Sequence, residues 1–301
     1  MALLTTICHQ FEEQGIRCQC GEPLSRHTTF KIGGPAGIFA TVSTQEQLAF
    51  AMRLCKQENV RSYILGNGSN VLFSDAGYDG VILHPGAEMG KIAVKDNAIT
   101  AGAAAQMGKV SYAASSNNLT GLEFAVGIPG SIGGGIYMNA GAYGGEIRDV
   151  LQQVTFLDED ANLRTLPAEE LELGYRKSIF ARKKWYMTEA VFCLREGSRE
   201  ESEAKMRDFM QRRKDKQPLE WPSAGSTFKR PEGAFAAALI EQCGLKGYRV
   251  GGAAISEKHS GFVINLGGAT CADVIRLTED VARIVKEQTG FQLEREVRVI
   301  E

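Results

Sequence analysis

The sequence lacks an excess of either charge, since 34 lysine and arginine residues are balanced by 36 aspartate and glutamate residues, for a net charge of −2. Nucleic-acid binding driven by bulk charge is not expected, because that mode usually shows a strongly basic domain. The chain also lacks a charged leader followed by an apolar core, so we expect no secretory signal. Its 44% apolar and 23% charged residues are typical of a globular protein and exclude disordered, collagen-like and coiled-coil chains.

Cysteine pairs at a recognisable metal-binding spacing are missing as well. The seven cysteines contain no CxxC pair, and Cys18-Gln19-Cys20 is the only close pair. A zinc site would need more ligands at a known spacing. We therefore predict reduced thiols and no metal site.

A membrane span is not expected, although residues 124–145 form an uncharged stretch of suitable length. This stretch contains Pro129 and eight of the 34 glycines of the chain. A segment so rich in glycine cannot hold a stable lone helix in lipid. We predict a system of loops there.

Apolar periodicity predicts separate helices and short strands rather than repeated βαβ units. Helices are expected over 3–14, over about a dozen residues after Thr44, over 199–216, from Pro231 to 243 and over 270–288. Strands are expected at 62–65, 71–73, 81–83, 98–102, 154–157 and 293–299. The charged helix at 199–216 is expected to open a new domain.

A first glycine motif, Gly66-Asn67-Gly68-Ser69-Asn70, follows directly on a predicted strand. Its glycines allow backbone N–H groups to converge on one anion, and the asparagine and serine side chains add donors, which suits a pyrophosphate. The motif is neither a GxGxxG fingerprint nor a P-loop. A plain hairpin turn remains an equal alternative.

A second motif covers residues 127–145 and is built almost entirely of small residues. We expect its backbone to lie against a flat or extended ligand, with tight packing between loops as the alternative. Together the two motifs favour a bound dinucleotide. The candidate contacts in the second motif are Gly127, Pro129, Gly130, Ser131, Gly133, Gly134, Asn139, Gly141 and Ala142.

Three further segments carry polar groups with less specific patterns. Arg176, beside Tyr175, offers a planar fork for a carboxylate or phosphate, but a solvated basic face is the ordinary interpretation. Ser226 lies in a glycine-containing segment that is usually only a turn. Glu294 and Glu296 lie on an alternating terminal segment and could simply be exposed charges.

In this order, these segments resemble the UDP-N-acetylenolpyruvoylglucosamine reductase family. The resemblance spans nearly the whole chain and rests on HTTFKIGGPA (27–36), LGNGSNVL (65–72), GLEFAVGIPGSIGGGIYMNAGAYGGEI (121–147), YRKSIF (175–180), PSAGSTFKRPEG (222–233) and LEREV (293–297). The chain is similar to the shorter form of that family, which lacks an inserted tyrosine-bearing loop.

The resemblance implies an α+β fold, with a two-subdomain FAD-binding part of the vanillyl-alcohol oxidase (PCMH) type and a C-terminal α+β substrate-binding domain. The implied domains are 1–85, 86–198 and 199–301. FAD would lie with its pyrophosphate on 66–70 and the 127–135 loop.

The implied reaction is the reduction of UDP-N-acetylglucosamine enolpyruvate, with FAD reduced first by NADPH. By the resemblance, Arg176 stabilises the enolate-like carboxylate, Glu296 shares that task and Ser226 donates the proton to C2 of the enolpyruvyl group. Tyr175 and Lys229 would contact the substrate. A cytoplasmic location in peptidoglycan synthesis follows, with no nucleic acid, membrane or obligate protein partner.

Two other functions remain possible on the residues alone. One is another flavin oxidoreductase of the same fold that acts on an alcohol and passes electrons to oxygen. The other is a non-catalytic nucleotide-binding module, in which Ser226 is only a turn residue.

Overall fold

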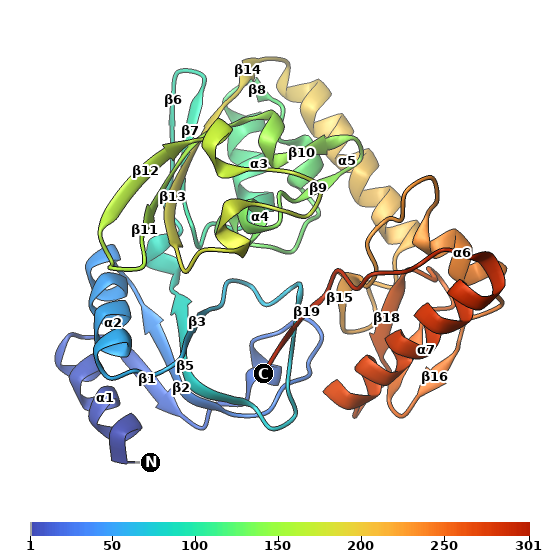
Figure 1. Ribbon diagram of the computed structural model, residues 1–301. Helices are drawn as coiled ribbons and strands as arrows, with labels where there is room; N and C mark the ends of the chain where they lie inside the picture. Colours follow the sequence, from blue (N-terminus) through green and yellow to red (C-terminus); the bar gives the residue numbers. More distant parts are fainter. Residues whose placement is uncertain (1) are drawn as a thin grey trace. The chain divides into compact units, whose positions relative to one another are not determined.

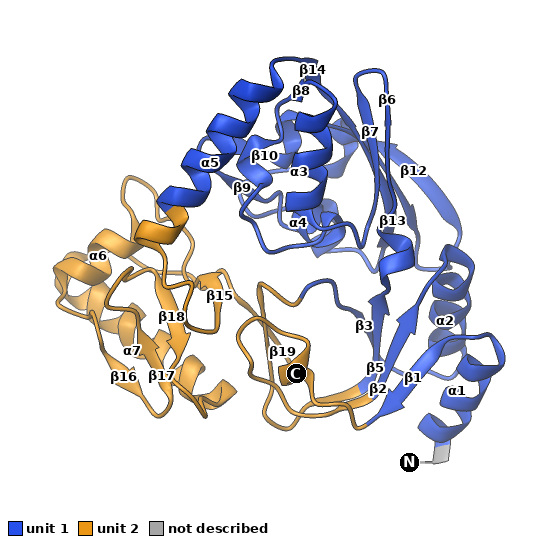
Figure 2. Ribbon diagram, turned by 180° about the vertical axis from the view of Figure 1, so that it is seen from behind, with its two compact units in different colours: residues 1–20, 38–67, 80–212 blue, residues 21–37, 68–79, 213–301 orange. Residues whose placement is uncertain are grey.

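The computed structural model describes residues 2–301, which form two compact units (Figures 1 and 2). Unit 1 contains the described residues up to 20 together with 38–67 and 80–212, and unit 2 contains 21–37, 68–79 and 213–301. The predicted boundaries after residues 85 and 198 stay predictions. Among the described residues, no helix has both the length and the apolar character needed to cross a membrane.

The first sheet of unit 1 has the strand order β1–β2–β5–β3. These strands are Arg17–Cys20, Ala36–Val42, Tyr78–Pro85 and Ser62–Ile64, with β1 antiparallel to β2 and β3 parallel to β5. Helices α1 (Ala2–Glu13) and α2 (Gln45–Gln57) pack on the sheet through one buried apolar cluster. This cluster includes Ile7, Phe11, Ile38, Leu48 and Val81.

Helix α2 begins after Thr44, as the sequence predicts. The Thr44 hydroxyl accepts a hydrogen bond from the Gln47 backbone N–H at 3.2 Å, and the Gln47 side chain accepts one from the Ser43 N–H at 2.7 Å. The first bond satisfies one of the donors left at the start of a helix. The second is made to the residue before the N-cap and not to Thr44 itself, so the pair is not a full capping box.

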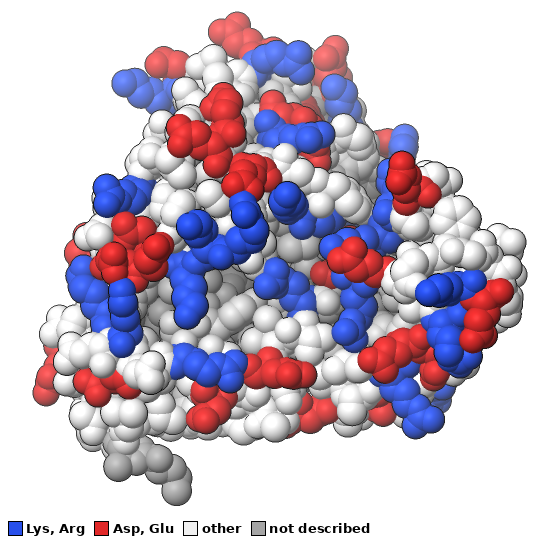
Figure 3. Space-filling model, viewed as in Figure 1, with Lys and Arg blue, Asp and Glu red and all other residues white. Residues whose placement is uncertain are grey.

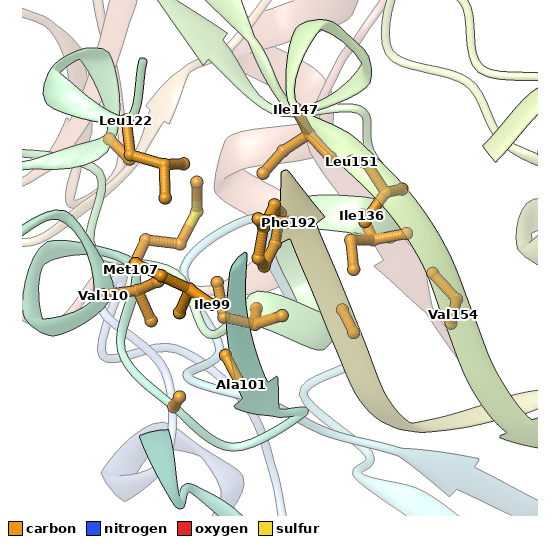
Figure 4. Packing of buried hydrophobic residues seen from close by; sticks show 14 of the residues in the cluster. Ile99, Ala101, Met107, Val110, Leu122, Ile136, Ile147, Leu151, Val154 and Phe192 are labelled. Atoms are coloured by element: carbon orange, nitrogen blue, oxygen red, sulfur yellow. The ribbon is translucent and has the colours of Figure 1, made fainter. Parts of the chain in front are cut away.

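The second sheet of unit 1 is antiparallel throughout, in the order β12–β11–β13–β7–β6. Its strands are Leu163–Pro167, Leu151–Leu157, Tyr186–Cys193, Ala98–Gly102 and Ile92–Lys95. Helices α3 (Met107–Ser116) and α4 (Ile132–Tyr137) share its core, which Figure 4 shows around Phe192.

Shorter elements complete unit 1. Strand β8 (Leu119–Thr120) pairs with β14 (Arg195–Glu196), and β9 (Gly141–Ala142) pairs with β10 (Gly145–Glu146). Helix α5 (Arg199–Lys216) has the predicted bounds, and its residues up to Arg212 belong to unit 1. Single-turn 3₁₀ helices of unit 1 lie at Ala87–Met89, Glu123–Ala125, Ile147–Asp149, Ala168–Leu171 and Ile179–Ala181, and another, Leu24–Arg26, lies in unit 2.

Unit 2 contains an antiparallel sheet in the order β15–β18–β17–β16. Its strands are Ser223–Ser226, Phe262–Asn265, Ala253–Ile255 and Arg249–Val250. Helices α6 (Ala236–Gln242) and α7 (Cys271–Thr289) share its core with Phe30 and Leu72. Strand β4 (Val71–Phe73) pairs in parallel with the terminal strand β19 (Arg298–Ile300).

Three expectations about elements need correction. Helix α6 begins at Ala236 rather than at Pro231, because the intervening Gly233 adopts φ +74°, which a right-handed helix does not allow. Phe235 is therefore the N-cap and is 61% exposed instead of lining the helix. The terminal strand covers only 298–300 instead of 293–299, and β3 ends at Ile64 instead of residue 65.

Candidate functional site

Within unit 1, the structure places Gly66 and Asn67 of the first glycine motif beside the second motif. A Cβ atom built on Gly66 would lie 2.5 Å from the Ser131 hydroxyl oxygen, and the Asn67 amide donates to the Pro129 carbonyl at 3.1 Å. Because 2.5 Å is shorter than any real Cβ contact, only glycine fits at residue 66 without a shift. The segments that the sequence assigned to one ligand are thus neighbours.

The hairpin alternative for residues 66–70 is wrong. Strand β3, before the turn, pairs with β5, whereas β4, after the turn, pairs with β19. The turn therefore connects strands of two different sheets, and the pairing of a hairpin does not explain its glycines.

Residues 68–70 belong to unit 2, and Gly68 packs on residues 27–29 of the HTTFKIGGPA segment. Gly68 has φ +61°, and a Cβ atom there would lie 2.0 Å from the His27 carbonyl oxygen. Its own carbonyl accepts the Thr29 N–H at 3.1 Å. Sequence reasoning gave residues 27–29 no role, although they stand in the signature that carried the resemblance. Their role in the structure is to hold this turn.

Ser131 and the two nearby glycines shape the start of helix α4. The buried Ser131 is the N-cap, and its hydroxyl accepts the Gly134 N–H at 3.3 Å. A Cβ atom on Gly133 would lie 3.3 Å from Ala103, whereas one on Gly134 would meet only the Ser131 hydroxyl at 3.5 Å. Gly134 is exposed, so packing within the protein does not require a glycine at this position.

Asn139 is fully buried, and its side chain holds three loops together. The amide nitrogen donates to a Glu146 carboxylate oxygen at 3.0 Å and to the Gly174 carbonyl at 3.1 Å. The amide oxygen accepts the Arg148 N–H at 3.0 Å. Since both amide hydrogens are used inside the protein, the side chain of Asn139 positions loops, and its predicted contact with a cofactor stays a prediction.

The other residues predicted from the second motif contribute only their backbone to this region. The Gly130 carbonyl accepts the Met107 N–H at 3.1 Å, and Gly141 and Ala142 form β9. Gly127 lies just after the 3₁₀ turn that ends at Ala125. None of these residues offers a side chain that could hold a ligand, so any binding here uses the backbone.

Arg176 lies in a tight turn next to the second motif. Gly174 and Lys177 exchange backbone hydrogen bonds at 3.0 and 3.1 Å, and Arg176 has φ +53° between them. Its guanidinium donates to the Gly141 carbonyl at 3.4 Å and lies 5.0 Å from the centre of the Tyr175 ring. The predicted arginine therefore reaches the glycine loop within unit 1.

Ser226 and Glu296 lie on adjacent segments of unit 2. The Glu296 N–H donates to the Thr227 carbonyl at 2.8 Å, and the Lys229 N–H donates to the Glu294 carbonyl at 2.8 Å. Ser226 is exposed at the end of β15, directly after Gly225 with φ +77°, and Glu296 is half-buried. The segments that contain Ser226 and Glu296 are thus joined by backbone hydrogen bonds.

Lys229 already has an acidic partner, since its ammonium group pairs with the carboxylate of Glu294. The neighbouring Arg230 lies with its guanidinium 4.7 Å from the centre of the Phe235 ring. A phosphate group at Lys229 would compete with Glu294, so its predicted contact with substrate stays a prediction.

The glycine segments fit a flat, extended anionic cofactor. Gly66 and Gly68 stand where a Cβ atom would strike neighbouring atoms, and the exposed Gly134 leaves the backbone of α4 accessible. The polar side chains of the first motif are all uncharged, and the Asn67 and Asn70 amides donate to backbone carbonyls. This donor set, without a lysine or a metal ligand, suits a pyrophosphate held by the backbone and by neutral groups.

Models of two protein families match separate parts of the chain. An FAD binding domain matches residues 36–166, and the C-terminal domain of UDP-N-acetylenolpyruvoylglucosamine reductase matches residues 217–300. The first match contains both glycine motifs, and the second contains Ser226 and Glu296.

Relatives with the same family name are similar along nearly the full length. The UDP-N-acetylenolpyruvoylglucosamine reductase of Lachnoclostridium phytofermentans is 50% identical over 288 residues, which cover 94% of this chain and 93% of that protein. The protein of that name from Clostridium perfringens is 50% identical over 278 residues, or 92% of this chain and 91% of that protein.

Solved structures agree with these matches. The UDP-N-acetylenolpyruvylglucosamine reductase of Thermus caldophilus superposes with a TM-score of 0.82 at 34% identity, covering 95% of this chain and 100% of that one. A berberine-bridge-enzyme-like protein of Physcomitrella patens shares the fold alone, with a TM-score of 0.50 at 14% identity, over 97% of this chain and 62% of that one. The predicted α+β fold with an FAD-binding part is confirmed, and the chain belongs to the UDP-N-acetylenolpyruvoylglucosamine reductase family.

Proposed function

We propose that this protein is a flavoenzyme that reduces UDP-N-acetylglucosamine enolpyruvate to UDP-N-acetylmuramate, with FAD as cofactor and NADPH as hydride donor. The observation that carries the proposal is the 50% identity to a reductase of that name along 94% of the chain. The FAD-binding match over residues 36–166 supports the cofactor. The same family membership supports a role in peptidoglycan precursor synthesis in the cytoplasm.

The chemistry determines what the protein must supply. Reduction of the enolpyruvyl double bond adds a hydride at C3 and a proton at C2, and negative charge develops at C2 and on the carboxylate. FAD, when bound, supplies the hydride chemistry. The side chains must then orient the carboxylate, stabilise its charge and hold a proton close to C2.

Arg176 is the residue proposed to meet the carboxylate. A guanidinium can bind both oxygens of a carboxylate at once, which fixes its orientation as well as its charge. The turn at 174–177 and the bond to the Gly141 carbonyl direct this side chain toward the glycine loop. The glycine loop and Arg176 are therefore held together within unit 1.

Ser226 is proposed to hold the proton for C2, and Glu296 to donate to the carboxylate. A hydroxyl is a weak acid, so Ser226 must work through position and through the strong basicity of the developing carbanion. The pairing of Ser226 with Phe262 in the sheet and the bond from the Glu296 N–H to the Thr227 carbonyl hold the backbone around Ser226. This rigidity is what a proton donor of low acidity needs.

The proposed substrate is a small molecule, and we predict no nucleic acid, membrane or obligate protein partner. On the face shown in Figure 3, acidic and basic side chains are interspersed. This agrees with the net charge of −2.

Ser226→Ala tests the proposed mechanism, because the two half-reactions can be measured separately. We expect reduction of the bound flavin by NADPH to stay within about twofold of wild type, whereas reoxidation by the enolpyruvyl substrate falls by at least about a hundredfold, the scale of losing a key transition-state group. Ser223→Ala, at the other end of β15, is the matched control and should change neither rate. Equal losses in both half-reactions would contradict the proton-donor role.

The two other functions predict different results when the flavin absorbance is followed in the same way. An oxidase that acts on an alcohol would show rapid reoxidation of the flavin by air and no response to NADPH. A non-catalytic nucleotide-binding module would be purified without flavin colour and would show no turnover.

A further inference from the structure

A cluster of three thiols lies at the start of the chain, apart in sequence from every residue assigned above. It consists of Cys8 on helix α1, Cys18 and Cys20 on strand β1, and the carboxylate of Glu12 on α1. We call these four residues the thiol cluster. All of them belong to unit 1, and the described structure records their cysteines as free thiols.

The secondary structure explains why these side chains converge. Cys8 and Glu12 are four residues apart on a helix, so they lie on one face in successive turns. Cys18 and Cys20 are two residues apart on a strand, so they point to the same side of it. A turn at Gly15, with φ +69°, folds the strand back beside the helix.

Buried apolar residues hold the helix and the strand in this arrangement. Ile7 and Phe11 of α1 and Ile16 before β1 are at most 1% exposed and belong to the same core cluster. Each of them adjoins the thiol cluster in the sequence without being part of it. The backbone positions that carry the four side chains are therefore held by these apolar residues, and Cys8 and Cys18 pack against the same core.

The ligand atoms are close enough to share one ion. The sulfur atoms of Cys8 and Cys18 are 2.7 Å apart, and both lie within 4.8 Å of a Glu12 carboxylate oxygen. Cys20 lies two residues after Cys18 on the same side of β1 and is exposed, so its thiol can turn toward the same ion. In a tetrahedral site with metal–sulfur bonds of about 2.3 Å, ligand atoms lie about 3.7 Å apart, so small side-chain rotations suffice.

We propose that Cys8, Cys18, Cys20 and Glu12 form a binding site for a zinc-type divalent ion. Three sulfur ligands and one carboxylate oxygen match the preference of Zn²⁺ for soft ligands in a four-coordinate shell, and they do not suit Mg²⁺ or Ca²⁺, which bind through oxygen alone. Binding displaces the thiol protons and creates no other covalent change.

Two features favour a metal site over a group of cysteines that only pack in the hydrophobic core. Cys8 and Cys18 do contact the core, but Cys20 and Glu12 are exposed, and a filler role does not account for them. A Glu12 carboxylate oxygen lies 3.5 Å from the Nδ1 atom of the His9 ring, and such a contact orients a carboxylate ligand. Exposure on this side also gives an ion a path of entry.

The sequence expectation of no metal site rested on spacing alone. The interval of nine residues between Cys8 and Cys18 matches none of the usual zinc patterns. A helix followed directly by a returning strand brings such distant positions together. The proposed ion would fasten α1 to β1, a structural role that leaves the reaction to other residues.

Co²⁺ is the spectroscopic probe for the site, used on the reduced, chelator-treated, FAD-loaded full-length protein. We expect one equivalent of Co²⁺ to produce the intense visible bands of a tetrahedral thiolate complex, at wavelengths beyond the flavin absorption. Zn²⁺ should abolish the bands by displacement. Cys8→Ser and Cys18→Ser should each weaken binding by more than about tenfold, the smallest effect usual for altering a metal site.

Cys193→Ser is the matched control, because Cys193 is an exposed cysteine on strand β13. It should bind Co²⁺ like wild type. Every variant should keep its flavin and its reductase rate, since no member of the thiol cluster has a proposed part in the reaction. Absence of the bands in wild type, or bands that persist unchanged in both Cys8→Ser and Cys18→Ser, would overturn the proposal.

A second measurement needs no variant. Alkylation of the wild-type protein by N-ethylmaleimide, followed by mass spectrometry, gives the rate at each cysteine with and without Zn²⁺. We expect Zn²⁺ to slow modification of Cys20 by at least about tenfold, in line with the loss of a free thiol to metal coordination, and to leave Cys193 unaffected. Equal rates at Cys20 under both conditions would refute the site.

Discussion

Arg176 combines an unfavourable backbone conformation with a side chain that the protein holds in place. A non-glycine residue with φ +53° carries a strain of about 1 kcal/mol or more. The turn bonds between Gly174 and Lys177 and the contact of its guanidinium with the Gly141 carbonyl maintain this conformation. Strain of this kind is common where a side chain must be presented to a ligand.

Arg176→Lys should therefore impair the second half-reaction selectively. A lysine keeps the charge but cannot bind both carboxylate oxygens in one plane, so we expect reoxidation of the flavin by the enolpyruvyl substrate to slow by about a hundredfold. Arg182→Lys is the control, because Arg182 is exposed and pairs with Glu172. Stopped-flow absorbance measures both variants, and a wild-type rate in Arg176→Lys would remove Arg176 from the site.

The lowered pKa of Glu123 predicts how the stability of unit 1 depends on pH. Burial alone would raise the pKa of this carboxyl, but hydrogen bonds from Thr120, Ser202 and the Gly121 N–H outweigh it and lower the pKa below its ordinary value. The ionised form thus stabilises the fold at pH values above the unfolded-state pKa, which is about 4.3 for an unperturbed glutamate. This stabilisation is lost as the pH falls through the lower folded-state pKa.

Glu123→Gln should reduce the free energy of unfolding by about 1–3 kcal/mol at pH 7, the range for hydrogen bonds to a charged group. The difference from wild type should shrink as the pH falls below about 4. Urea unfolding at a series of pH values measures it. Glu170→Gln, at an exposed position, should show almost no difference, and a Glu123→Gln effect independent of pH would contradict the role of the ionised carboxylate.

At the scale of elements, local sequence signals predicted helices well where caps are present. Helix α7 begins after Thr270, with the Asp273 capping box, and ends at Gly290 with φ +79°, so both ends are encoded within a few residues. Helix α6 lacks a side-chain cap. Its start at Ala236 depends on the conformation of Gly233, which periodicity does not reveal.

Strand partners were less predictable than the strands themselves. Strands β3 and β4 are separated by only six residues, yet they pair with β5 and β19 in different sheets. A partner more than 200 residues away leaves no trace in a local pattern. This is why spacing alone left the hairpin and the ligand-binding turn as equal alternatives for residues 66–70.

Gly134→Ala separates the two possible reasons for a glycine in helix α4. Alanine should stabilise the flavin-free protein by up to about 1 kcal/mol, because it favours a helix over glycine and its Cβ atom would have ordinary contacts only. If FAD lies against this backbone as proposed, the same methyl group should weaken FAD binding by about tenfold or more.

Thermal unfolding of the flavin-free protein and fluorescence titration with FAD measure the two effects of Gly134→Ala. The unfolding midpoint acts as the internal control, since a rise in it shows that the fold is intact. Unchanged FAD affinity in a stabilised variant would mean that residue 134 lies away from the cofactor.

At the scale of the whole molecule, the chain is interleaved between the two units. Unit 2 contains residues 21–37 and 68–79 in addition to 213–301. A sequence read from one end to the other favours continuous domains, and it cannot show that the strand at 71–73 pairs with the end of the chain. Figure 2 shows this exchange of segments by colour.

Arg176 belongs to unit 1, and Ser226 and Glu296 belong to unit 2. Family membership was predictable from the sequence because the specific motifs are long and occur in a fixed order. The roles of individual residues within those motifs stay predictions, since they depend on substrate and cofactor geometry.

The visible spectrum of the purified protein tests the central claim most directly. We predict a bound-flavin spectrum that bleaches when NADPH is added without oxygen and returns in full on addition of UDP-N-acetylglucosamine enolpyruvate. Protein purified without flavin and unable to take up FAD, or reduced flavin that the enolpyruvyl substrate does not reoxidise, would contradict the proposed function.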